Sequence, residues 1–242
     1  MYFQDLARSL KLKMKKSFKL SVLMPVYNEA KTVTEIVHRV LARPEVYELI
    51  IVDDCSTDGT REKLAKIKNK KTRVLFHNAN QGKGMAIRTA LENVTGTHVV
   101  IQDSDLEYDP RDYRIMMAQV LEGKAEVVYG SRFYGPHKNM LFWHKVANDA
   151  LNLLVNILFD TTISDCETCY KLVPTELFKS LNITSRRFDL EIEVTCKILK
   201  RGIRIWEVPI TYAGREYADG KKIKFSDGVI AFLRVLRYRF LD

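Results

Sequence analysis

Short aliphatic runs alternate with longer amphipathic segments along the first half of the chain. The runs cover residues 20–24, 47–52, 74–77 and 99–101, and each ends in polar or turn-forming residues. Such runs are typical of buried parallel strands. Between them, apolar positions recur three, four and seven residues apart, as in 33–41, which predicts amphipathic helices. This alternation predicts an α/β fold with a mostly parallel central sheet flanked by helices.

The second half of the chain continues the alternation less regularly. Further helices and strands are expected over residues 113–121, 126–130, 143–159, 188–200 and 203–208. The last segment, residues 226–240, carries apolar residues at helical spacing among arginines. This pattern predicts a basic amphipathic helix at the C-terminal end.

A length of 242 residues suits one sizeable domain with its own core. We expect a basic lead-in over residues 1–19, whose first four residues resemble the remnant of a cleaved tag. A main α/β domain over residues 20–214 follows, and then a basic loop with the amphipathic helix over residues 215–242. No apolar run reaches the ~20 residues of a membrane span, and the N-terminus lacks a secretory leader pattern.

The charge balance suggests an anionic partner. Lys and Arg number 39 against 30 Asp and Glu, a formal net charge of +9. Nucleic acid, a nucleotide or phospholipid, and an anionic membrane surface all fit this charge. No recognition helix, zinc finger or aromatic RNA-binding pattern accompanies it, so we expect no nucleic-acid partner.

The four cysteines are too few for a disulfide scaffold in a chain of this size. Cys166 and Cys169 have CxxC spacing, but no second pair completes a zinc site. Free thiols in a reducing cytoplasm are the prediction, with a redox pair as the alternative.

Acidic residues follow three of the predicted strands. Asp103 and Asp105 come directly after the run 99–101, and Glu29 and the pair 53–54 follow the first two runs. Ligands of α/β sheets collect outside the carboxyl ends of the strands. A hard divalent cation is held by one or two carboxylates plus phosphate oxygens. The pattern favours a metal–nucleotide site, whereas the DxD alone could also be a solvated acidic turn.

Several motifs in order resemble the inverting family 2 glycosyltransferases, which have the GT-A fold with a Rossmann-like nucleotide-binding half. The chain is most similar to the polyprenyl-phosphate branch, the dolichol-phosphate mannose synthase-like enzymes. The matching segments are residues 25–29 (PVYNE), 52–60 (VDDCSTDGT), 80–84 (NQGKG), 102–107 (QDSDLE), 130–132 (GSR), 208–210 (VPI), Arg215 and 220–222 (GKK).

The resemblance implies roles for these residues. It places a Mg²⁺ or Mn²⁺ ion on Asp103, Asp105 and Glu107. Donor-binding positions that match the family are Pro25, Tyr27, Glu29, Asp54, Asp103, Ser104, Asp105, Arg132, Arg215, Lys221 and Lys222. Carboxylates suit base and ribose because they accept hydrogen bonds, and arginines suit the donor diphosphate or an acceptor phosphate.

Catalytic positions implied by the resemblance are Asp105, Arg132 and Asp165. Asp165 could act as a general base or could only position the acceptor, because a lipid phosphate is already anionic. Residues 168–170 read Thr-Cys-Tyr where relatives often carry Gly-Phe, so the details of the acceptor loop stay open.

The expected function is metal-dependent, inverting transfer of one sugar from GDP-mannose or a UDP-sugar to a dolichyl or undecaprenyl phosphate. We expect a peripheral enzyme at the cytoplasmic face of a membrane, held on anionic lipid by Arg234, Arg237 and Arg239. The alternative is that the helix packs its apolar side onto the domain itself or onto a second subunit of a homo-oligomer, with the arginines only solvated. A soluble glycan or cell-surface polysaccharide acceptor, a nucleotidyltransferase and a nucleic-acid-binding protein are the other functions weighed.

Overall fold

A computed structural model of the chain describes residues 18–138, 141–187, 189–215 and 225–241. Its strands form one sheet in the order β3-β2-β1-β4-β6-β5-β7. They are β1 (Leu20–Val26), β2 (Val46–Asp53), β3 (Thr72–Phe76), β4 (His98–Ile101), β5 (Val127–Ser131), β6 (Lys171–Pro174) and β7 (Ile205–Pro209). Every pairing is parallel except those of β6, which runs antiparallel to β4 and β5. The predicted α/β fold with a mostly parallel sheet is confirmed.

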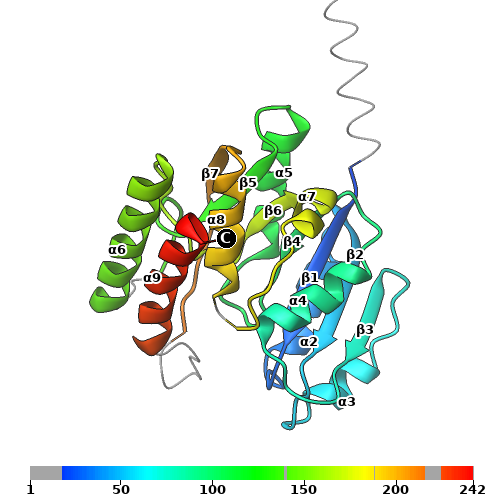
Figure 1. Cartoon of the computed structure of the whole chain (residues 1–242). Coiled ribbons are helices and arrows are strands. Elements are labelled where there is room, and N and C mark those ends of the chain that lie inside the picture. The colour runs from blue at the N-terminus through cyan, green and yellow to red at the C-terminus, as the bar shows by residue number, and fades with distance from the viewer. Residues whose placement is uncertain (1–17, 139–140, 188, 216–224, 242) are drawn as a thin grey trace, which may run out of the picture.

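Helices flank the sheet (Figure 1). They are α2 (Val33–Leu41), α3 (Thr60–Ala65), α4 (Lys83–Glu92), α5 (Tyr113–Leu121), α6 (Phe142–Phe159), α7 (Thr175–Ser180), α8 (Leu190–Lys200) and α9 (Phe225–Phe240), with a 3-10 turn η1 (Pro110–Asp112). All residues of β1 are buried. This explains why β1 reads as a continuous apolar run rather than an alternating one.

The segment that the sequence did not reveal is β6 with its short helix α7. β6 is four residues long and contains both Lys171 and Pro174, so it lacks the apolar run of the other strands. Lys171 is nevertheless fully buried, and its ammonium donates hydrogen bonds to the carbonyls of Cys166 and Thr168. Tertiary contacts therefore overrule the weak strand preference of this segment.

Helix α9 packs against α6 and α8 at the edge of the molecule beyond β7 (Figure 1). Its inner side is formed by Ala231, Val235 and Tyr238, all of which are buried. The Tyr238 hydroxyl lies 3.1 Å from Oγ of Ser185, at the end of the segment that leads into α8. The amphipathic helix is thus part of the same packed body. In the described parts of the chain, no helix is long and apolar enough to cross a membrane.

Candidate active site

The carboxyl ends of β1, β2, β4 and β5 bring the predicted site residues to one edge of the sheet. Glu29 follows β1, Asp54 follows β2, Asp105 follows β4 and Arg132 follows β5. This is the edge at which ligands of such sheets bind. Three groups of polar side chains occupy this edge. The first surrounds Asp54, the second contains the DxD aspartates with Lys83 and Arg215, and the third is the ion pair of Arg132 and Asp165.

The first group is centred on Asp54, which is buried. Its carboxylate accepts hydrogen bonds from the backbone N–H of Gln81, at 2.9 Å, and of Gly82, at 2.7 Å. Nδ1 of His77 lies 2.7 Å from the same carboxylate. Asp54 thus fixes the turn that opens α4, besides any contact that it makes to a donor.

The turn at Gly82 and Gly84 requires glycine. Gly82 has φ +93°, and a Cβ there would lie 2.1 Å from the carbonyl oxygen of Arg186. A Cβ on Gly84 would lie 2.0 Å from the carbonyl oxygen of Ser185. The start of α4 therefore lies directly against the backbone that leads into α8. This contact brings Lys83, the first residue of α4, close to α8.

Lys83 holds the first aspartate of the DxD. Its ammonium lies 2.7 Å from Oδ1 of Asp103 and 2.7 Å from Oε1 of Glu191 on α8. Burial opposes the charge on Lys83, but Asp103, Cys169 and Glu191 raise its pKa well above the usual range. Lys83 lies in the matching segment 80–84, but neither Lys83 nor Glu191 is among the site residues predicted from the sequence. The glycines on both sides of Lys83 were the signal that could have identified it.

Arg215 holds the second aspartate. Its Nη2 lies 2.7 Å from Oδ2 of Asp105, and its Nη1 lies 3.1 and 3.2 Å from the two carboxylate oxygens of Glu29. Its Nε lies 3.4 Å from Oε1 of Glu107, which also accepts the Arg215 backbone N–H at 2.8 Å. One guanidinium therefore joins three carboxylates from two strand ends.

Crowding of the carboxylates affects the pKa of Asp105. Burial, together with the charges of Asp103 and Glu107, raises its pKa to about 7, although Arg215 opposes the shift. Asp103 behaves differently: burial would raise its pKa, but Lys83 outweighs burial and lowers it. The two aspartates of one motif therefore differ in how readily they carry a charge.

The carboxylate oxygens of Asp103, Asp105 and Glu107 are of the kind that binds a hard divalent cation. In the described residues, however, no three acidic, histidine or cysteine side chains converge as a metal-holding set. Mg²⁺ commonly takes one or two carboxylates and completes its shell with water and substrate phosphates. Asp103 and Asp105 suit such a partial site, with Glu107 beside them.

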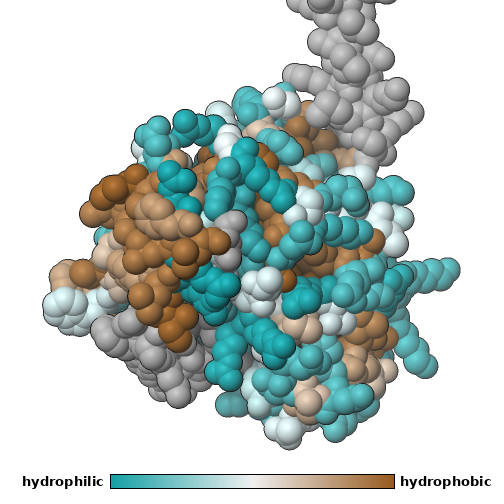
Figure 2. Space-filling model, in the orientation of Figure 1, coloured by the Kyte–Doolittle hydropathy of each residue, from teal (hydrophilic) through white to brown (hydrophobic). Residues whose placement is uncertain are grey.

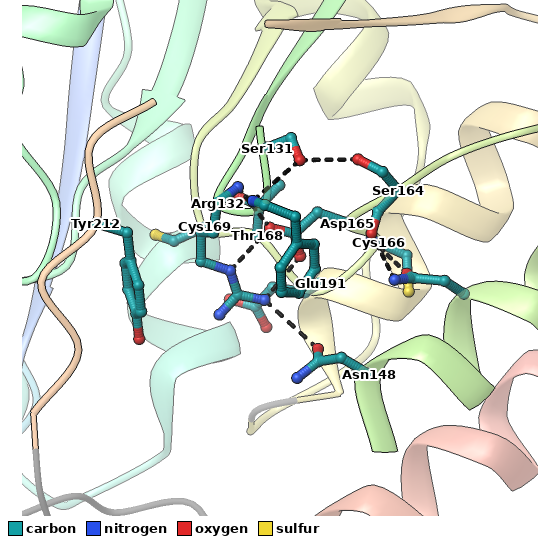
Figure 3. Close-up of polar contacts among 12 residues, drawn as sticks. Ser131, Arg132, Asn148, Ser164, Asp165, Cys166, Thr168, Cys169, Glu191 and Tyr212 are labelled. Atoms are coloured by element: carbon teal, nitrogen blue, oxygen red, sulfur yellow. Dashed lines mark hydrogen bonds and ion pairs between the residues drawn. The ribbon is translucent and has the colours of Figure 1, made fainter. Parts of the chain in front are cut away.

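The third group is the ion pair of Arg132 and Asp165 (Figure 3). Asp165 is completely buried, and its Oδ2 accepts from both Nε, at 2.8 Å, and the backbone N–H of Arg132, at 3.0 Å. Its Oδ1 accepts from Nη2 at 2.7 Å. Both carboxylate oxygens are thus engaged by one arginine, and this pairing fixes the orientation of the Arg132 guanidinium.

Neighbours from three elements hold this pair in place. Asn148 on α6 accepts a hydrogen bond from Nη2 of Arg132 at 3.5 Å, and the guanidinium lies 5.3 Å from the Tyr212 ring centre (Figure 3). Glu207 on β7 accepts the backbone N–H groups of Ser164 and Asp165. These contacts fix the loop that carries Asp165.

Glu167 is a partly buried acid next to this loop. Its Oε1 has no hydrogen-bond partner among the described residues. Burial and the charge of Glu191 raise the pKa of Glu167 to about 7, although Lys171 and Arg132 oppose the shift. A carboxyl with this pKa is largely protonated below neutral pH.

The remaining predicted residues are placed as follows. Pro25 lies in β1, Tyr27 is partly exposed just beyond it, and Ser104 is buried between the two aspartates. The Ser104 carbonyl accepts a hydrogen bond from the Thr32 hydroxyl. Lys221 and Lys222 lie outside the described residues. Besides Lys83 and Glu191, the structure adds Asn148 and Tyr212, which the sequence analysis did not name.

This chain matches the sequence family described as glycosyl transferase family 2 over residues 21–181. It belongs to that family. It is an enzyme that transfers sugars, as the resemblance predicted.

Curated proteins with similar sequences support this family assignment. The chain is 31% identical over 220 residues to glycosyltransferase AglJ of Haloferax volcanii, covering 89% of this chain and 70% of the relative. It is 25% identical to the dodecaprenyl-phosphate galacturonate synthase of Rhizobium johnstonii, covering 85% and 62%. It spans about half, 51%, of a 26% identical hexosyltransferase of low-salt glycan biosynthesis, Agl6, from H. volcanii.

Solved structures share the fold. Glucosyl-3-phosphoglycerate synthase from Mycobacterium tuberculosis superposes with a TM-score of 0.72 at 20% identity, over 95% of this chain and 82% of the other. The same synthase in complex with Mn²⁺, UDP-glucose and phosphoglyceric acid gives a TM-score of 0.72 at 20% identity, over 93% and 79%. The GT-A fold is therefore confirmed.

Proposed function

We propose that this glycosyltransferase transfers one sugar from a nucleoside-diphosphate sugar to a polyprenyl phosphate at a membrane surface, with inversion at the anomeric carbon. One observation carries the acceptor assignment: helix α6 joins the cationic site to an exposed apolar surface. Asn148 of α6 contacts Arg132. On the same helix, Phe142, Trp143 and Ile157 are each at least two-thirds exposed.

The apolar surface extends onto the neighbouring helix. Figure 2 shows hydrophobic side chains gathered over α6 and α9. On α9 the exposed apolar residues are Ile230, Leu233, Leu236 and Phe240. A continuous patch of this kind marks an interaction site. An acceptor with a phosphate head and an apolar tail would match the cation and the patch together.

One detail of the membrane hypothesis changes with the structure. Arg234 forms an ion pair with Asp189, 3.0 Å away, so its charge is engaged within the protein. Arg237 and Arg239 are exposed, and the Arg239 guanidinium lies 5.5 Å from the Phe159 ring centre. Val229, one of the apolar residues expected on this helix, has a side chain that lies outside the described residues.

The proposed transfer uses the side chains of the site described above. An acceptor phosphate oxygen forms a bond to C1 of the sugar while the bond from C1 to the donor diphosphate oxygen breaks on the opposite face. Arg132, oriented by Asp165, would hold the acceptor phosphate through charge-assisted hydrogen bonds. No general base is required because the phosphate is already anionic. A Mg²⁺ or Mn²⁺ ion at Asp103 and Asp105 would neutralise charge on the leaving nucleoside diphosphate.

A donor and acceptor screen tests the proposal. Nucleotide release from GDP-mannose and from UDP-sugars is measured with Mg²⁺ or Mn²⁺, with and without a short polyprenyl phosphate. We expect stimulation by the polyprenyl phosphate, none by the matching polyprenol, and a glycosylated lipid phosphate by mass spectrometry. Stimulation by a soluble glycan or phosphate ester instead would assign a soluble acceptor and contradict the lipid proposal.

Vesicle binding tests the membrane surface separately. Arg237→Ser with Arg239→Ser should weaken co-sedimentation with phosphatidylglycerol-containing vesicles roughly 30-fold, because each basic residue near anionic lipid contributes ~1 kcal/mol. Ile157→Ser with Leu233→Ser should weaken it at every salt concentration. Tyr47→Ser, an exposed aromatic on β2, serves as the control. If neither double variant weakens vesicle binding, the lipid contacts another surface of the protein.

A further inference from the structure

Both aspartates of the DxD are already paired with basic side chains in the protein alone. Asp103 is held by Lys83, and Asp105 by Arg215. The Arg215 guanidinium also joins Glu29 and Glu107, so it lies among the oxygens that suit a divalent cation. A cation that binds Asp105 there must first displace this guanidinium.

The two pairs differ in how firmly they are held. Lys83 is fixed between Asp103 and Glu191, and its side chain is only 13% exposed. The Arg215 side chain is 21% exposed, and Tyr212 and Arg215 both donate hydrogen bonds to Glu107. The Arg215 backbone N–H is anchored by Glu107. The guanidinium can therefore leave Asp105 while the backbone stays in place.

The charges of this group favour the exchange. Glu29, Asp105 and Glu107 carry up to three negative charges, and Arg215 supplies one positive charge. A divalent cation neutralises the group better than the guanidinium does. A displaced guanidinium would then be left without an anion, unless a diphosphate arrives with the metal and takes up its hydrogen bonds.

We propose that Arg215 makes metal binding depend on the donor: in the free enzyme its guanidinium occupies the metal-binding carboxylates, and the donor diphosphate draws it away. This inference rests on the proposed metal–nucleotide function and adds the residue that couples the two ligands. Coupling is reciprocal, so the nucleotide tightens metal binding by the same factor as the metal tightens nucleotide binding.

The test measures Mn²⁺ binding to the full chain without turnover, from the electron paramagnetic resonance signal of free Mn²⁺, with and without UDP or GDP. Without nucleotide, Arg215→Gln should bind Mn²⁺ about tenfold more tightly than the wild type, within the usual range of such couplings. Arg215→Lys should fall between them, because an ammonium cannot engage several carboxylates through one planar fork. Nucleotide should tighten Mn²⁺ binding strongly in the wild type and far less in Arg215→Gln.

Arg111→Gln is the matched control. It removes the same charge from an arginine that pairs with Asp109 outside the group, so Mn²⁺ affinity should not change. Equal or weaker Mn²⁺ binding by Arg215→Gln would overturn the inference, and with nucleotide still tightening Mn²⁺ in both proteins the proposed function would stand. Absence of Mn²⁺ binding even with nucleotide would overturn both.

Discussion

Arg132 and Arg215 both bring a guanidinium to the carboxyl edge of the sheet, but their surroundings differ. Arg132 is paired with one fully buried carboxylate, Asp165, which engages it through both oxygens. Arg215 is more exposed and is shared among three carboxylates. The first arrangement balances its charges and fixes one geometry. The second leaves excess negative charge, which suits a group that must exchange partners when ligands bind.

Breaking the Arg132 pair should have the largest effect on the protein itself. Asp165→Asn leaves the Arg132 guanidinium, only 12% exposed, without its counter-charge, which should lower the free energy of unfolding by about 3 kcal/mol. Urea denaturation measures this loss. Glu35→Gln breaks an exposed arginine pair on α2 and should cost less than about 1 kcal/mol. Equal losses in the two variants would show that burial does not distinguish the Arg132 pair.

Breaking the Arg215 group should act on turnover instead of folding. Asp105→Asn should lower turnover on the order of 10²-fold or more, because it removes part of the electrostatic stabilisation of the leaving group. Stability should change little, since one of several crowded carboxylates is neutralised. Glu122→Gln, an exposed acid paired with Lys124, controls for surface charge. Near-normal metal-dependent turnover of Asp105→Asn would remove this residue from the site.

The smallest expected effect is a pH dependence of stability that arises beside the Arg132–Asp165 pair and not at the Arg215 group. Glu167, next to the Asp165 loop, has a pKa raised to about 7 by burial and Glu191. The folded protein therefore keeps a proton that the unfolded chain releases at the ordinary, lower pKa. This contribution to stability is complete at acid pH and is lost as the pH rises through about 7.

Glu167→Gln cannot lose this proton. Between pH 5 and pH 8, the variant should lose less stability than the wild type by on the order of 1–3 kcal/mol, measured by urea denaturation at both values. Glu176→Gln on α7, at an exposed position, should follow the wild type. Parallel curves for Glu167→Gln and the wild type would mean that Glu167 is ionised across this range.

Much of the framework could be predicted from the sequence because it depends on local pattern. Apolar runs such as residues 47–52 mark buried strands, and acidic residues directly after them mark the ligand-binding edge of a parallel sheet. The antiparallel strand β6 could not be predicted, because Lys171 and Pro174 interrupt the apolar pattern that marks a buried strand. Its lysine is stabilised by carbonyls from the adjacent loop, which no local pattern reveals.

The sequence by itself determined the α/β class, the family and the strand ends at which the carboxylates gather, since each is set by residue order and spacing. Tertiary structure alone decided which basic side chain pairs with which carboxylate. Arg215 contacts Glu29 across 186 positions of the chain, and Lys83 joins Asp103 to Glu191 on another helix. Such pairings depend on how the strand ends and loops are brought together in space, because ion pairs form between neighbours in the fold whatever their separation along the chain.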